Sequence, residues 1–433
     1  MIVKDVSIFT NDGSFIEKGY LKTNNGIIEE VSEGSPGSTE EKVYSFPNKI
    51  LMPGLVNAHT HIYSTFSRGM PLKGFSPNAF TELLEQMWWK LDRALTMKGN
   101  KLSAYLASIE SMKTGVTTLI DHHSSPNAVK GSLDMIASAV NEAGLRCSTA
   151  FEISDRNGKK VRDQSIDENL RFAETKNKFR VPYIGLHASF TLSDETLELV
   201  SEANKNRIPI HVHVAEGPED EENSISLYGK RIVQRFNDAG LLTENSLLVH
   251  CIHTDEKEDE IIRNNGCFVV VNPQSNMNNG VGYPDWKGKL SRGTRVCLGN
   301  DGFGFNLFTE SRFLILGMHN EKKDPKAADP LDLQKTLFDY NYQLTSKIFG
   351  LKMGKIKKGY AADFAIYDYK PPTVLNNENF PGHLFFGVGD NPKVTDVFVH
   401  GRPIMISGKS VLIDEERLFK ECREYSAELW KHL

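Results

Sequence analysis

The chain has 433 residues, of which 25% are charged and 39% are hydrophobic, with a net charge of −5 at pH 7. This composition is typical of a soluble globular protein with a large core, and the lack of a basic stripe argues against a nucleic-acid partner. The longest apolar runs are far shorter than the ~20 residues of a membrane span, so no membrane partner is expected. The five cysteines form no CxxC pair and the first residues lack an export-signal pattern, which together predict a cytoplasmic protein.

Short strands and turns are expected at both ends of the chain. The strand-like runs there are residues 1–9, 20–32, 362–369, 394–405 and 407–413. The run 20–32 resembles a hairpin around an Asn-Gly turn, and residues 414–433 have the period of an amphipathic helix. We therefore expect residues 1–52 and 355–433 to form one small β-sandwich domain with a C-terminal helix.

Between these ends, short β-rich runs alternate with helical stretches. The eight runs are residues 54–58, 116–120, 146–153, 183–188, 208–214, 246–251, 267–271 and 295–299. The intervening stretches, such as 101–115 and 193–207, are amphipathic, and Ser193 is a plausible N-cap for the second. Strand-helix alternation predicts a parallel sheet, and eight such units over ~300 residues predict a (β/α)8 TIM-like barrel in residues 53–354. The predicted fold class is therefore α/β.

Nine of the thirteen histidines lie between residues 59 and 253, most of them at the C-terminal ends of these runs. The polar residues at the run ends are His59, His61, His122, His123, His187, His211, His213, Glu216, His250 and Asp301. In a barrel those ends converge on one mouth, where active sites are built. Imidazole and carboxylate ligands suit zinc, with iron or another divalent ion possible. A catalytic metal would lower the pKa of its bound water toward ~7.

Several of these residues have an alternative, structural interpretation. His122 and His123 are adjacent, so at most one of them can point inward, and each is either a pocket contact or a structural hydrogen-bond partner. His211 lies deeper in its run than His213, which favours core packing. Trp88 and Trp89 could form a stacking wall for a flat substrate or pack within a helix.

Five motifs resemble the amidohydrolase superfamily, in its cytosine, guanine and methylthioadenosine deaminase and chlorohydrolase branch. They are PGLVNAHTH (53–61), HVHVAEG (211–217), VHCIH (249–253), SNMNNGVG (275–282) and LGNDGFG (298–304). WWKLDRAL (88–95), DHHSSP (121–126) and SNMNNGVGY (275–283) resemble the SsnA-type aminohydrolases more narrowly. The resemblance runs nearly from end to end of the chain.

The resemblance implies a role for each matching residue. His59, His61, His213 and Asp301 would bind one divalent metal ion, with zinc favoured and iron possible. Glu216 matches the proton-shuttling glutamate, His250 the histidine beside the attacking water, and His187 a substrate contact. The relatives with two metals carry a carboxylated lysine in the run 183–188, which this sequence lacks, so one metal is expected.

These features together predict a metal-dependent aminohydrolase that cleaves a C–N bond of a purine-like N-heterocycle, with catalytic Glu216, His250 and Asp301. His187 and one of His122 and His123 are the expected substrate contacts. A free base is expected over a nucleoside, because no carboxylate pair for a ribose is evident. Relatives of this branch are often dimers, so a homodimer is expected. The alternatives are a chlorohydrolase, a nucleoside deaminase or a non-catalytic metal-binding protein.

Overall fold

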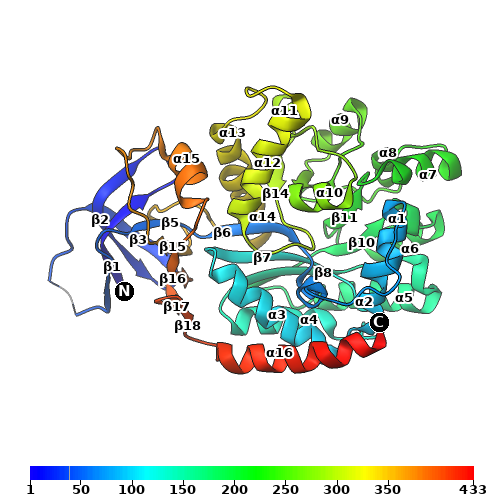
Figure 1. Ribbon diagram of the computed structural model, residues 1–433, viewed down its shortest axis with the longest axis horizontal. Coiled ribbons are helices and arrows are strands. Elements are labelled where there is room, and N and C mark those ends of the chain that lie inside the picture. The colour runs from blue at the N-terminus through cyan, green and yellow to red at the C-terminus, as the bar shows by residue number, and fades with distance from the viewer. Residues whose placement is uncertain (39) are drawn as a thin grey trace.

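The computed structural model describes residues 1–38 and 40–433, and it has two sheet-containing parts that lie next to each other (Figure 1). Strands from both ends of the chain form one part. The remaining strands and most of the helices form the other. No helix in the described residues is long and apolar enough to cross a membrane.

Nine strands from the two ends of the chain form a single mixed sheet. They are β1 (Ile2–Phe9), β2 (Phe15–Asn24), β3 (Ile27–Glu33), β4 (Val43–Ser45), β5 (Ile50–Pro53), β15 (Phe364–Tyr367), β16 (Val394–Val399), β17 (Arg402–Ile406) and β18 (Lys409–Ser410). The strand order is β18-β17-β16-β15-β5-β1-β2-β3, with β4 paired to β1. The antiparallel pair β5–β15 therefore joins the N-terminal strands to the C-terminal ones. The predicted hairpin is present, and Asn25 and Gly26 both take positive φ values at its turn.

The central strands form two parallel sheets. One contains β6 (Leu55–Thr60), β7 (Val116–His123), β8 (Arg146–Phe151) and β9 (Arg180–Pro182), and the other contains β10 (Ile184–Ala188), β11 (Ile210–Val214), β12 (Leu247–His250), β13 (Phe268–Val271) and β14 (Val296–Leu298). Isolated parallel bridges link their edges, from Thr60 to Asp301 and from Ile153 to Leu186. Each of the eight predicted runs overlaps one of these strands, and the short β9 lies outside the predicted runs. The α/β class is therefore confirmed.

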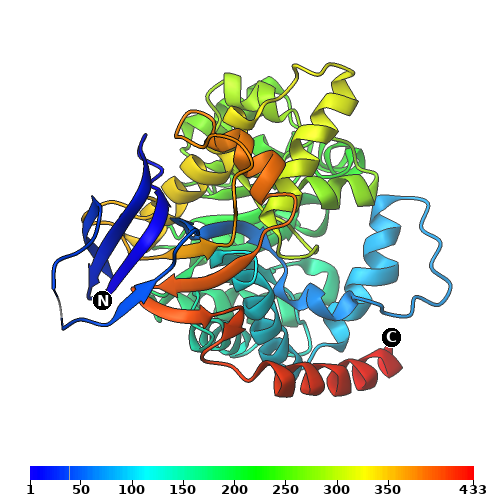
Figure 2. The ribbon, with the colours of Figure 1, turned by 60° about the vertical axis from the view of Figure 1, so that its left-hand side comes forward.

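Helices separate the parallel strands along the chain and pack around them (Figures 1 and 2). They are α1 (Phe80–Leu83), α2 (Trp89–Ala94), α3 (Met97–Met112), α4 (Ser132–Glu142), α5 (Lys159–Ala173), α6 (Asp194–Ala203), α7 (Pro218–Tyr228), α8 (Ile232–Asp238), α9 (Glu256–Asn264), α10 (Pro273–Asn279), α11 (Trp286–Ser291), α12 (Leu307–Lys322), α13 (Pro330–Gln334) and α14 (Asn341–Phe349). Ser193 caps α6, and its hydroxyl accepts a hydrogen bond from the backbone N–H of Thr196. This N-cap is the one that the sequence predicts.

The C-terminal segment returns to the central part of the molecule. After the short helix α15 (Phe380–His383) and the last strands, α16 (Glu415–Leu429) runs alongside α3 (Figures 1 and 2). The Tyr425 hydroxyl contacts the Thr96 hydroxyl at 3.1 Å, and the Trp430 indole N–H donates to the Phe66 carbonyl at 3.0 Å. These bonds hold the C-terminus close to the segment that follows β6.

The parallel strands are buried, although several of them carry histidines. Every residue of β6, β7, β8 and β10 to β14 is buried, as expected for parallel strands that are covered on both faces. Buried polar side chains are costly unless they are hydrogen-bonded or bind a ligand. The histidines in these strands therefore need partners.

Candidate active site

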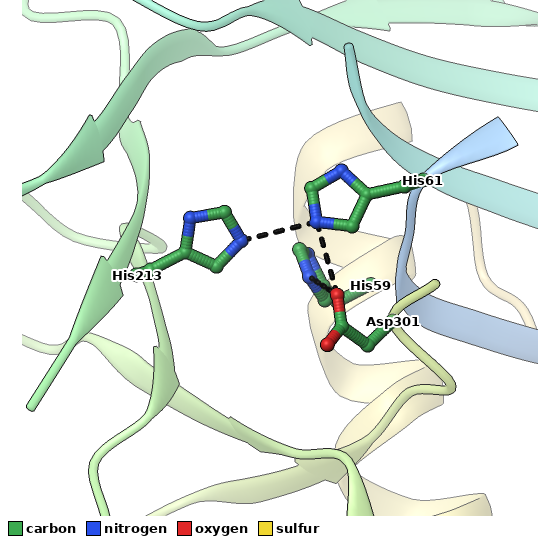
Figure 3. A group of neighbouring side chains, drawn as sticks. All are labelled: His59, His61, His213 and Asp301. Atoms are coloured by element: carbon green, nitrogen blue, oxygen red, sulfur yellow. Dashed lines mark hydrogen bonds and ion pairs between the residues drawn. The ribbon is translucent and has the colours of Figure 1, made fainter. Parts of the chain in front are cut away.

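Four of the expected site residues meet at one point. His59 lies in β6 and His61 directly follows it, His213 lies in β11, and Asp301 follows β14 (Figure 3). The Asp301 Oδ1 atom lies 3.3 Å from His59 Nε2 and 3.0 Å from His61 Nε2. His61 Nε2 lies 3.2 Å from His213 Nε2. The structure thus brings together all four residues that the sequence suggests as metal ligands.

In His61 and His213, the Nδ1 atom points away from the cluster and forms a hydrogen bond, and this bond determines where the proton of a neutral ring lies. His61 Nδ1 donates to the His122 carbonyl at 2.6 Å, and His213 Nδ1 donates to the His187 carbonyl at 2.9 Å. When both rings are neutral, their Nε2 atoms are therefore lone-pair acceptors, and they point at each other and toward the Asp301 carboxylate. Converging lone pairs repel one another in a buried site unless a cation lies between them.

The spacing of the four donors suits a metal ion. Ligand atoms at 2.0–2.2 Å from a tetrahedral ion stand about 3.3 Å apart. The contacts of 3.0–3.3 Å in this cluster are close to that value. Three imidazole nitrogens and one carboxylate oxygen are also the donor types that zinc and similar divalent ions prefer. The residues therefore fit a divalent metal.

Burial and charge set the protonation of the cluster. Burial lowers the pKa of His59 to about 3 and that of His213 well below its usual value, so both rings are neutral ligand candidates. Burial also opposes protonation of His61, but the hydrogen bond and charge of Asp301 outweigh it and raise the pKa of His61 to about 9. Without a metal ion, a proton on His61 would therefore compensate the charge of Asp301.

The backbone around Asp301 is tied closely to β6. The backbone N–H groups of Asn300 and Asp301 both donate to the His59 carbonyl, and the N–H of His61 donates to the Asp301 carbonyl. A side chain on Gly299 would meet the His59 backbone at 2.7 Å, so glycine is required there. Asp301 and His250 also have positive φ values of 55° and 69°, which are unusual outside glycine and often mark functional positions.

A second carboxylate lies beside the cluster. Glu216 Oε2 is 3.3 Å from His250 Nε2, and Glu216 Oε1 accepts a hydrogen bond from Asn279 Nδ2 at 3.2 Å. Burial and the charge of Asp301 raise the pKa of Glu216 well above its usual value, which favours the protonated acid. His250 Nδ1 accepts from Asn276 Nδ2 at 2.7 Å, so the proton of this neutral ring is on Nε2.

A pocket opens next to these residues, with an empty volume of about 620 Å³ including its mouth. His61, His213, Asp301, Glu216 and His187 lie in its wall. Its aromatic and aliphatic lining consists of Tyr63, Phe80, Leu84, Trp88, Trp89 and Phe190. Both tryptophans therefore face the pocket, although they belong to a π-helical turn and to α2, respectively.

The two histidines at the end of β7 point in different directions and neither lines the pocket. His122 Nε2 donates to the carbonyls of Leu186 and His211 at 3.1 and 3.0 Å, and its ring packs 4.7 Å from that of His213. His123 Nε2 instead bonds to the Ser125 hydroxyl at 2.7 Å. Alternation along the strand explains the split. Both rings are in contact with other protein groups, and a direct substrate contact by one of them stays a prediction.

His211 has a role beyond core packing. Its Nε2 lies 2.8 Å from His59 Nδ1, and this hydrogen bond turns the His59 ring so that Nε2 faces Asp301. The Ser275 hydroxyl similarly donates to Asp301 Oδ2. Such outer contacts orient the ligands of metal sites and tune their basicity.

A charged group in the pocket wall is absent from the sequence-based expectations. Glu152 follows β8 and Asp92 lies in α2, and both line the pocket. Arg156 joins them, with Nη2 3.2 Å from Glu152 Oε2 and in contact with Asp92 Oδ2. Glu152 lies near the C-terminal end of the predicted run 146–153, as the histidines do in their runs, and this position could have revealed it. Asp92 and Arg156 lie on helical turns and carry no such signal.

A model of the amidohydrolase family matches residues 50–404. The chain belongs to the amidohydrolase family. It is 28% identical over 439 residues to a 5'-deoxyadenosine deaminase of Methanococcus maripaludis, with 99% of each chain covered. It is 30% identical over 440 residues to a 5-methylthioadenosine/S-adenosylhomocysteine deaminase of Halalkalibacterium halodurans, with 96% of each covered.

Solved structures share the fold of this amidohydrolase. An adenosine deaminase from Xanthomonas campestris with bound zinc superposes with a TM-score of 0.84 at 21% identity, covering 99% of this chain and 98% of that one. The atrazine chlorohydrolase TrzN from Arthrobacter aurescens, complexed with zinc, gives 0.83 at 18% identity, covering 98% and 99%. At these identities the likeness concerns the fold alone.

Proposed function

We propose that this amidohydrolase is a metal-dependent aminohydrolase that cleaves a carbon–nitrogen bond of a purine-like N-heterocycle. The observation that carries the proposal is the convergence of His61 Nε2 and His213 Nε2 on the Asp301 carboxylate, beside Glu216, a buried carboxyl group whose pKa is raised by burial and by Asp301. A structural metal site would need no neighbouring acid. The relatives named above as deaminases support the reaction type.

His59, His61, His213 and Asp301 would hold one metal ion, most simply zinc. When bound, the metal supplies an activated water molecule near neutral pH. Asp301 is placed to accept a proton at the cluster, and Glu216 is placed to deliver one to a ring nitrogen and so make the adjacent carbon electrophilic. The Nε2–H of His250 can donate to the oxygen that gains charge at that carbon.

A C–O bond to water forms at that carbon and the C–N bond breaks, and the proton that Asp301 has accepted passes to the departing nitrogen. An exocyclic nitrogen leaves as ammonia, whereas a ring nitrogen remains attached and the ring opens. Trp88 and Trp89 line the pocket and offer faces against which a flat ring can stack. His187 also lines the pocket and offers a ring nitrogen to the substrate, while its Nδ1 contacts the Thr191 hydroxyl at 2.7 Å.

The structure removes the reason to expect a free base in preference to a nucleoside. That expectation rested on the lack of a carboxylate pair that could bind a ribose, whereas Asp92 and Glu152 both line the pocket. The relatives named for 5'-deoxyadenosine and 5-methylthioadenosine are nucleoside deaminases. We therefore extend the proposed substrate class to purine-like bases and nucleosides, and a side-by-side comparison of kcat/KM separates the two.

The finer architecture forms part of the same proposal. The two parallel sheets, bridged at Thr60–Asp301 and Ile153–Leu186, support one closed (β/α)8 barrel in residues 53–354. The shared apolar cluster of β1, β2, β3, β5, β15 and β16 supports a β-sandwich formed by residues 1–52 and 355–433. A homodimer and a cytoplasmic location also remain proposals. Light scattering at micromolar concentration tests the dimer.

Ammonia release from a panel of purine and pyrimidine bases and nucleosides tests the proposed reaction. The protein is assayed as purified, after chelation, and after zinc is added back. The proposal expects ammonia from at least one ring, loss of this activity on chelation and recovery with zinc. A metal-loaded protein that releases ammonia from none of these rings, with no ring opening detected by ultraviolet absorbance, would support a non-catalytic metal-binding protein.

A further inference from the structure

Glu152 lies where its carboxylate can form a hydrogen bond with the edge of a bound substrate ring. Its side chain is only 4% exposed, yet it lines the pocket. Its carboxylate lies within 4.8 Å of ring nitrogens of His187 and His213. Glu216 instead groups with His250 and Asp301. The two carboxylates therefore lie beside different members of the expected metal-binding cluster, Glu152 beside His213 and Glu216 beside Asp301.

The contacts of Glu152 hold it as a charged acceptor. Arg156 Nη2 lies 3.2 Å from its Oε2, and the Arg156 guanidinium is buried with only 7% of its side chain exposed. The Trp89 ring covers that guanidinium at 5.1 Å. On the other side, His122 Nδ1 lies 3.3 Å from Glu152 Oε1. The hydrogen bond from Arg156 orients the carboxylate, which is part of the pocket wall.

The hydrogen-bonding capacity of the Glu152 carboxylate limits which substrate groups can lie against it. A carboxylate accepts hydrogen bonds only, so it attracts an N–H group and repels a ring nitrogen lone pair. In an adenine nucleoside, the amino group is the leaving group and the neighbouring ring nitrogen receives the proton. The other free ring nitrogens, N3 and N7, are both hydrogen-bond acceptors. An amino-lactam ring such as guanine still has a ring N–H.

We propose that Glu152 accepts a hydrogen bond from a ring N–H of the substrate and so selects lactam-type heterocycles over rings that present only acceptors. This inference rests on the proposed aminohydrolase function and names its preferred substrate class. The chemistry at the metal cluster is the same for both ring types. Selection thus depends on Glu152, and the acid Glu216 serves both.

Binding of rings that are not hydrolysed tests Glu152 apart from turnover. Hypoxanthine and its derivatives methylated in turn at each ring N–H are titrated into the zinc-loaded protein, with tryptophan fluorescence as the readout. Because a hydrogen bond to a charged acceptor is strong, one methylation should weaken binding at least ~10-fold more in the wild type than in Glu152→Gln. The comparison between variants cancels the steric effect of the methyl group.

Ser124→Ala is the matched control. The Ser124 hydroxyl bonds to Asp92 and Arg156 in the same network but does not line the pocket. This variant should retain the wild-type ratios. Equal ratios in the wild type and Glu152→Gln, or no binding of hypoxanthine, would overturn the role of Glu152. A lack of ammonia release with intact N–H selectivity would instead overturn the proposed function.

Discussion

His61 Nε2 and His213 Nε2 face each other at 3.2 Å in a buried cluster, and the outer nitrogen of each ring donates to a backbone carbonyl. With both rings neutral, two lone pairs and the Asp301 carboxylate thus point to one position. A cation there relieves their repulsion, so the site is organised before the metal arrives. The proposed chemistry depends on this arrangement.

Removal of one donor should abolish metal retention. The His213→Ala variant retains three of the four proposed metal ligands. Metal analysis of the purified variant should therefore find far below one equivalent per chain. His319→Ala is the control, because His319 bonds only to the Ala328 carbonyl away from the cluster. A His213→Ala protein with its full metal content would show that the ligands were assigned wrongly.

The Glu216→Gln variant should still bind the metal but lack the proposed general acid. Turnover should fall ~10²-fold or more, the usual worth of general acid–base catalysis. The pKa of Glu216 is raised by burial and by Asp301, so the wild-type rate should decline as the pH rises through that pKa and the acid loses its proton. The variant should lack this alkaline decline. A pH–rate profile of both proteins is the measurement, and near-normal turnover would identify another carboxylate as the acid.

His211→Gln should weaken metal binding without removing a ligand. The substitution disturbs the 2.8 Å contact that orients His59, and loss of such an outer contact typically costs ~10–100-fold in metal affinity. Competition with a chromophoric zinc chelator measures the change. Unchanged affinity would return His211 to a packing role.

Asp363→Ala should destabilise the protein. Arg146 is fully buried and makes two bonds to the Asp363 carboxylate at 2.7 and 3.2 Å, which link β8 to the start of β15. Removing one partner leaves a buried charge unpaired, so the free energy of unfolding should fall by roughly 3–5 kcal/mol. Denaturant unfolding at a fixed zinc concentration measures it. Asp390→Ala, which removes a largely exposed partner of Arg312, should change stability by no more than about 1 kcal/mol.

The residues that the sequence could predict share one property, their place on a strand end. His59 lies near the end of β6 and His61 just after it, His213 is the last residue but one of β11, and Asp301 follows β14, so the parallel strands place them together. The orientation of His122 and His123 could not be predicted, because the phase of β7 depends on packing. Asp92 and Arg156 approach Glu152 only through helices and turns whose position a sequence pattern does not specify.

Stepwise addition of zinc to chelated protein tests the central claim most directly, with the rate of ammonia release measured on the best substrate of the panel. Our account predicts almost no release from the metal-free protein and a linear rise that saturates at one equivalent of zinc per chain. Full ammonia release without metal, or saturation only at two equivalents, would contradict a single metal ion held by His59, His61, His213 and Asp301.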